Sequence, residues 1–316
     1  MAWYDSIAPE YVRNVANSFW QEVGFDVFDV FPKLTVRKDY GMIGQYSVED
    51  LMRIGNPDDF ANIPGAPVES KGITLASSYE PYTLLEYRTH RLVTKTEVED
   101  YEAPFRPIAD ATQDVVGKLD RITVKVFAQK FMTTGVWGAD KAGGTDFTKW
   151  DDANSDPQKD VLAWKAEVLS QTGFEPNVLA VTYDVYAQLL TNSAVRSLLK
   201  VTDDKVVTAD KLAKLFDLDR VAVMRTVETT AQKGKTKTSA NTGFVKSKSA
   251  LLVYRPEVAS RNKPSGGYAI VKASGITTKS IPQPDKNDAL KIEGAVTIAF
   301  KSLAPSLGVF ASDVIS

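Results

Sequence analysis

The segment DPQKDVLAWKAEVLSQTGFEPNVLAVTYDVYAQLL, residues 156–190, carries clear signals for where a helix begins and ends. Asp156 can cap the first backbone N–H groups, and Pro157 lacks the N–H that would be unpaired at the first helical position. Gly173 suits the left-handed conformation that closes many helices. The pattern predicts a helix over residues 156–172 with a buried stripe of Val161, Trp164, Val168 and Leu169.

Helices and strands alternate from this segment towards the C-terminus. Residues 178–182 are a short apolar run, which is typical of a central β-strand. Further helices are predicted over residues 183–190, 193–199 and 208–216, and further strands over residues 220–226, 250–254, 268–273, 277–281 and 295–299. This alternation, followed by consecutive strands, predicts an α+β domain.

A long helix is predicted before this domain, over residues 105–132. Pro107 suits its first turn, and no further proline interrupts the apolar pattern that follows. The apolar residues are Ile108, Val115, Leu119, Ile122 and Val126 on one stripe, with Val116, Val124, Phe127 and Phe131 beside it. A helix of about 25 residues spans ~38 Å, longer than most helices in a compact domain. Gly117 weakens it by ~1 kcal/mol relative to alanine and is a candidate place for a bend.

The chain before the long helix is expected to be extended and to need partners. Residues 1–35 are rich in aromatic side chains and contain a helical pattern of Tyr11, Val12, Val15, Phe19 and Trp20. Such a segment packs either on its own domain or on another subunit, and both alternatives are open. Residues 71–76 and 82–98 predict the two strands of a long hairpin with a turn at 77–81. The second strand is charged on both faces, so the hairpin needs a partner surface.

The composition limits the possible chemistry. The 316 residues carry a net charge of −2, which gives no general attraction to nucleic acid or to anionic membranes. There is no cysteine, which excludes disulfides, thiolate metal sites and cysteine nucleophiles. The single histidine, His90, excludes sites that need two imidazoles. The chain has no apolar run of about 18 residues and no secretory signal pattern, which favours a protein kept in a cytosol or in a particle assembled there.

Few residues are candidates for catalysis or metal binding. The sequence has no phosphate-binding loop, no dinucleotide-binding glycine motif and no nucleophile elbow. The acidic pairs that could bind a divalent ion are Asp151 and Asp152, Asp203 and Asp204, and Asp217 and Asp219. All lie in predicted loops or at helix ends, where solvated or capping aspartate is ordinary. We therefore predict no catalytic, cofactor or metal site.

Two other polar groups have ordinary interpretations. His90 lies near Arg88 and Arg91 in an extended segment and is predicted to be an exposed polar residue. Lysines that could contact a nucleic acid are Lys233, Lys235, Lys237, Lys246 and Lys248. Only one aromatic residue, Phe244, lies among them, which favours a solvated loop.

The order of these elements resembles the major capsid proteins of tailed bacteriophages that have the HK97 fold. The resemblance lies in a helix, the sequence Thr172-Gly173-Phe174-Glu175-Pro176-Asn177, an apolar strand and a helix that ends in leucine. It continues through a helix and a strand at residues 211–223, a strand at 251–254 with a proline two residues later, and Gly267-Tyr268. Residues 106–273 carry the resemblance, and the first hundred residues match only in layout.

The resemblance implies an α+β, HK97-like capsid fold with six segments. These are an N-terminal arm (1–50), a connecting segment (51–67), an extended hairpin called the E-loop (68–103), a P-domain with the long helix as its spine (104–149), an A-domain (150–273) and strands that return to the P-domain (274–316). In this layout the arm and the E-loop reach neighbouring subunits, which explains why they have no predicted partners within the chain.

The resemblance also implies a function. The chain is expected to be a non-enzymatic virion protein that assembles in the host cytoplasm, through pentamers and hexamers, into an icosahedral shell. The shell would enclose phage DNA without sequence-specific binding, cofactor or membrane. Because the chain begins with arm-like sequence, a separate scaffolding protein is expected, as is a portal. Lys95 lies in the expected E-loop, but no motif marks an acceptor for a Lys–Asn cross-link.

Two other functions are open. An encapsulin-like nanocompartment shares the fold and encloses protein cargo. A soluble metal-dependent enzyme that uses the aspartate pairs is the more distant alternative.

Overall fold

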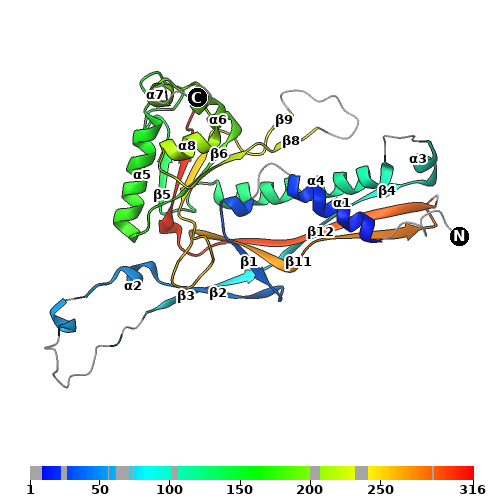
Figure 1. Cartoon of the computed structure of the whole chain (residues 1–316), viewed down its shortest axis with the longest axis horizontal. Helices are drawn as coiled ribbons and strands as arrows, with labels where there is room; N and C mark the ends of the chain where they lie inside the picture. The colour runs from blue at the N-terminus through cyan, green and yellow to red at the C-terminus, as the bar shows by residue number, and fades with distance from the viewer. Residues whose placement is uncertain are drawn as a thin grey trace.

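The protein consists of two bodies and a projecting ribbon, as seen in a computed structural model (Figure 1). The structure describes residues 9–22, 27–55, 57–61, 72, 75–100, 106–199, 207–231, 241–286 and 288–316. We call the flat, elongated part the P body, the part that stands upright at one end of it the A body, and the strands β2 and β3 the ribbon. The architecture is α+β, as predicted.

The P body is a four-stranded sheet covered by one long helix. The sheet has the order β1 (Lys33–Val36), β11 (Gly267–Gln283), β12 (Ala289–Ser302) and β4 (Leu85–Val93). The helix α4 (Pro107–Phe131) lies along it, which confirms the prediction for residues 105–132. Val115 and Leu119 of α4 pack on Val296 of β12. Gly294 permits this close approach, because a Cβ there would lie 2.6 Å from Cγ1 of Val115.

The described part of the N-terminal segment packs on its own chain. The helix α1 (Pro9–Glu22) lies against α4, and Val12 is buried with Ala111 of α4 and Ile292 of β12. After the short helix η2 (Val27–Asp29), Phe31 is completely buried. Residues 9–22 and 27–36 therefore belong to the P body, so the alternative of packing on the same domain is correct for them. Residues 1–8 and 23–26 lie outside the described part.

The A body is a five-stranded sheet with helices. Its order is β5 (Ala139–Ala142), β13 (Gly308–Ser312), β10 (Ala250–Val253), β6 (Val178–Thr182) and β7 (Arg220–Met224). The helices are α5 (Pro157–Thr172), α6 (Tyr183–Thr191), α7 (Ser193–Leu199) and α8 (Ala209–Leu215). The predicted boundaries of α5 are confirmed: Asp156 accepts a hydrogen bond from the Lys159 amide, and Gly173 has φ +70°. Leu169, predicted to be buried, is 43% exposed.

The ribbon differs from the predicted hairpin. The strands β2 (Tyr40–Tyr46) and β3 (Ser77–Thr83) pair antiparallel, and α2 (Val48–Met52) and η3 (Pro57–Phe60) lie between them. The expected hairpin is wrong for residues 77–98: the expected turn at 77–81 lies in β3, β4 pairs with β12, and Lys95–Asp100 form the helix α3. Residues 71, 73 and 74 of the other expected strand lie outside the described residues. Strand propensity marks extended segments but not their partners. The described strands of the projecting hairpin are therefore residues 40–46 and 77–83, whereas residues 85–93 of the expected E-loop (68–103) lie in the P-body sheet.

Three further strand placements differ from the expected layout. Strand β13 was expected to return to the P-domain, but it lies in the A-body sheet between β5 and β10. Strand β5 also lies in that sheet, although residues 104–149 were assigned to the P-domain. Strand β11 begins at Gly267, inside the range expected for the A-domain, and is one bent strand instead of two. Its register shifts between Val271 and Ile276, where Gly275 adopts φ +62°.

Candidate assembly surfaces

One face of the ribbon is anchored to the body of the subunit. Ile43 and Tyr82 are buried in a cluster with Ile270 of β11. Beside them the buried side chain of Gln45 accepts hydrogen bonds at Oε1 from the Ser265 amide (3.4 Å) and the Tyr268 hydroxyl (3.3 Å). Burial raises the pKa of Tyr268 to about 12, so this hydroxyl keeps its proton at neutral pH. These contacts fix the direction in which the ribbon projects.

The opposite face of the ribbon is apolar and exposed. Tyr40 is 74% exposed, Met42 68% and Tyr79 51%. The register places Met42 opposite Pro81, and Tyr79 opposite Gly44, so these side chains share one side of the strands. A contiguous exposed apolar face of this kind is typical of a protein–protein contact site.

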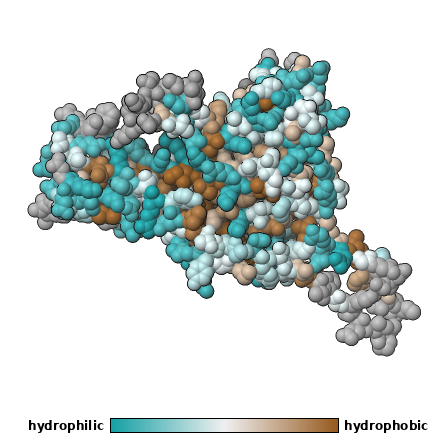
Figure 2. Space-filling view, turned by 180° about the vertical axis from the view of Figure 1, so that it is seen from behind, coloured by the Kyte–Doolittle hydropathy of each residue, from teal (hydrophilic) through white to brown (hydrophobic). Residues whose placement is uncertain are grey.

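The A body has a smaller aromatic surface. Tyr183 and Tyr186 of α6 have ring centroids 6.4 Å apart, and Phe244 of β9 (Thr242–Phe244) lies 5.6 Å from Tyr183. Tyr183 is 40% exposed and Phe244 38%. Aromatic residues that are only half covered are enriched at interfaces between subunits. Figure 2 shows that hydrophobic side chains are also exposed near the middle of the molecule, whereas the upper part of the A body is mainly hydrophilic.

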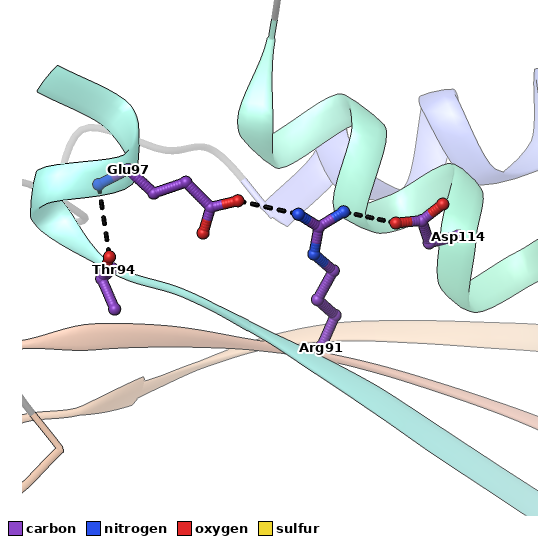
Figure 3. A network of polar contacts seen from close by, with 4 residues as sticks. All are labelled: Arg91, Thr94, Glu97 and Asp114. Carbon is purple, nitrogen blue, oxygen red and sulfur yellow. Dashed lines mark hydrogen bonds and ion pairs between the residues drawn. The ribbon is translucent and has the colours of Figure 1, made fainter. Parts of the chain in front are cut away.

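The end of the P body is held by ion pairs (Figure 3). Arg91 of β4 donates hydrogen bonds to Glu97 of α3 (2.7 Å) and to Asp114 of α4, and the Thr94 hydroxyl accepts one from the Glu97 amide. Partial burial disfavours the charge of Arg91, but the two carboxylates outweigh it and raise its pKa. The strand, the short helix and the spine helix α4 are therefore joined at one guanidinium.

The described aspartates of the acidic pairs each make their own local contacts. Asp151 accepts a hydrogen bond from the Ser316 amide (3.0 Å), and Asp152 accepts one from the Asn154 amide (2.8 Å). Among the described residues no group of three histidines, aspartates or glutamates is placed to hold a metal ion. Asp203 and Asp204 lie outside the described residues.

The remaining pair supports the fold of the A body. Asp217 forms an ion pair with the buried Lys165 (3.1 Å), and Asp219 accepts a hydrogen bond from Asn177 (2.7 Å). The same asparagine donates to the Arg255 carbonyl and accepts from its amide, so it joins three segments. This asparagine belongs to the Thr-Gly-x-x-Pro-Asn sequence, whose last residue thus has a structural role.

The other polar candidates also occupy ordinary positions. His90 is exposed, as predicted, and lies opposite Glu293 in the register of β4 with β12. The Lys246 ammonium lies 5.7 Å from the ring centroid of Phe310, and the Lys248 amide donates to Asp184. Lys233, Lys235 and Lys237 lie outside the described residues. In the part of the chain that is described, no helix is both long and apolar enough to span a bilayer.

The exposed face of the ribbon was not predicted from the sequence. A signal was present, because Tyr40 and Met42 alternate with small or inward-facing residues, as do Tyr79 and Pro81. Alternation shows that two faces differ, but only the anchoring of Ile43 shows which face is covered within the subunit.

No protein-family model matches the chain, and no curated protein matches it in sequence. Solved structures do match, across nearly the whole chain. A phage-related protein from Bordetella bronchiseptica RB50 has a TM-score of 0.67 at 17% identity, with 95% of this chain and 97% of that chain covered. The capsid of the cyanophage P-SCSP1u has a TM-score of 0.52 at 11% identity, with 92% and 89% covered. The holo-SrpI encapsulin complex from Synechococcus elongatus PCC 7942 has a TM-score of 0.53 at 10% identity, with 99% and 90% covered.

These matches establish the fold. The chain has the HK97 fold.

Proposed function

We propose that this chain is the major capsid protein of a tailed bacteriophage. It assembles with copies of itself, through pentamers and hexamers, into an icosahedral virion shell that encloses double-stranded DNA. The observation that carries the proposal is the ribbon: one face is anchored on the subunit, and the other presents Tyr40, Met42 and Tyr79 to solvent. Burial of such side chains contributes about 1.5–3 kcal/mol each. A neighbouring copy that covers this face recovers that energy at every contact in the shell.

The six-segment layout becomes part of this proposal in a revised form. The spine helix α4 with its sheet forms the P-domain, and the five-stranded sheet with α5–α8 forms the A-domain. The ribbon of β2 and β3 belongs to the extended hairpin that reaches a neighbour. The part of the arm within residues 9–22 and 27–36 stays on its own subunit.

The partners and the place of assembly are part of the same proposal. The shell assembles in the host cytoplasm with a separate scaffolding protein and a portal, and it contacts DNA without reading its sequence. The protein is structural and needs no cofactor. If the chain expressed alone forms shells of one correct size efficiently, the scaffolding part of the proposal is wrong.

The first test is the assembly state of the purified full chain. Size-exclusion chromatography and negative-stain microscopy should show capsomers or closed shells. A discrete oligomer of a few subunits, with no shells or capsomers under any condition, contradicts the proposal. Particles from infected or native cells separate the two shell functions, because nuclease-protected DNA supports a capsid and enclosed folded protein supports an encapsulin.

The second test places a charge on the exposed face of the ribbon. Met42→Glu should leave the subunit folded, since this side chain is 68% exposed, but should abolish or strongly reduce shell formation. Ser78→Glu is the matched control, because it adds the same charge to an exposed position on the other face of the ribbon. Normal shells from Met42→Glu would show that this face is not an assembly surface.

A further inference from the structure

A positively charged groove runs between the spine helix and a hairpin of the A body. One wall is α4, and the other is the hairpin of β8 (Val227–Thr229) and β9. The groove has a volume of about 540 Å³. Lys118, Arg121 and Lys125 line it from the helix, and Glu228 is the only acidic lining residue among those that the structure describes.

The charges in this groove are not balanced. Lys125 forms an ion pair with Glu228 across the groove. Lys118 and Arg121 are exposed, and no carboxylate of the described residues pairs with either of them. Three cations and one carboxylate leave the groove with a net charge of about +2, in a chain whose total net charge is −2. The positive charge is therefore a local feature of this surface.

The spacing of the cations suits a regular polyanion. Lys118, Arg121 and Lys125 are three and four residues apart, so they form one row on the helix. At 1.5 Å per residue the row is about 10 Å long. One strand of a DNA duplex carries one charge per about 3.4 Å of axis, so the row spans about three phosphates.

The other groove residues contain no group that would read bases. None of the described lining residues is aromatic, so they offer no platform on which a base can stack. The hydroxyls of Thr229 and Thr242 bond within the hairpin: Thr229 donates to the Asn241 carbonyl (2.9 Å) and contacts the Thr242 hydroxyl (3.2 Å). The groups left to bind a ligand are the positively charged side chains in the row on α4. Such charges contact phosphates and not base edges.

We propose that this groove binds the phosphate backbone of nucleic acid without sequence specificity. An acidic peptide segment would also meet the positive charge, but the row matches the regular charge spacing of a nucleic acid strand. The inference rests on the proposed function in one respect: the DNA packaged in the shell supplies the phosphates. Each subunit would then provide one weak contact, and many copies would distribute such contacts over the enclosed genome.

The experiment measures binding of the unassembled full chain to a fluorescent DNA duplex of mixed sequence as salt is varied. Each phosphate contact contributes about −0.9 to the slope of log K against log salt concentration. Lys118→Gln combined with Arg121→Gln should therefore reduce the slope by about 2 and weaken binding at low salt. Lys130→Gln is the matched control, since Lys130 is exposed on the same helix outside the groove, and it should change the slope little.

Three outcomes overturn the inference. They are a wild-type slope in the double variant, a loss in the control as large as in the double variant, and displacement of the duplex by polyglutamate as effectively as by unlabelled DNA at equal charge. The last result assigns the groove to an acidic peptide. Negative-stain microscopy of wild type and double variant keeps the two proposals apart. A wild-type chain that forms shells but does not bind the duplex refutes only the groove, whereas a wild-type chain that forms no shells or capsomers refutes the proposed function.

Discussion

The N-terminal segment contributes to the core of the subunit, and Phe31→Ala tests this directly. Phe31 is completely buried, with ring centroids 4.5 Å from Phe131, 5.7 Å from Phe127 and 6.0 Å from Trp137. If residues 1–50 were an arm held only by neighbouring subunits, the loss of this ring would hardly affect an isolated subunit. The structure predicts a large effect instead.

The expected magnitude follows from burial and packing. Replacing a buried phenylalanine by alanine costs about 3–5 kcal/mol, which includes the lost transfer energy and the cavity left behind. Contacts between aromatic rings account for about 0.5–1.5 kcal/mol per pair within such losses. The folding equilibrium constant of Phe31→Ala should therefore fall between about 100-fold and 5,000-fold.

The assay is urea unfolding of the unassembled subunit, followed by tryptophan fluorescence, because assembly would stabilise both proteins by mass action. The slope against urea should stay constant while the midpoint falls. Phe28→Ala is the control: this ring is only partly buried beside the same cluster, so its loss should cost clearly less. If Phe31→Ala changes the free energy of unfolding by less than about 1 kcal/mol, the assignment of this segment to the core is wrong.

Three further substitutions test other parts of the packing. Gly294→Ala should lower the free energy of unfolding by about 1–3 kcal/mol through overpacking, because its Cβ would lie 2.6 Å from a valine methyl carbon of α4. Gly243→Ala is the control: its Cβ would meet no atom within 4 Å, so it should be nearly neutral in urea unfolding. Gly173→Ala should lower the thermal midpoint, because alanine at φ +70° costs about 1 kcal/mol; an unchanged midpoint contradicts this. Burial raises the pKa of Asp160, whose carboxylate accepts a hydrogen bond from Trp150. The stabilising contribution of Asp160 is therefore complete below its ordinary pKa of 3.8 and is lost as the pH rises through the raised value. Asp160→Asn should therefore become more stable relative to wild type from acid to neutral pH. A difference in urea midpoint that stays constant with pH would refute this.

The signals that were correct in the sequence are local ones. Pro107 marks the start of α4, and Asp156 with Gly173 marks both ends of α5, since capping depends on residues within one turn of the helix end. The apolar run of β6 is buried throughout, as its composition predicted. The order of such elements was also sufficient to suggest the HK97 fold.

The sequence by itself therefore determined α4, α5, β6 and the α+β class of the chain. Only the tertiary structure decided which strands pair: β3 with β2, β4 with β12, and β13 within the A body. It also decided that Phe31 lies in the core and that one face of the ribbon stays exposed. The physical reason is that a strand presents the same hydrogen-bonding groups to any partner, so pairing depends on which apolar faces, distant in the chain, can be buried together.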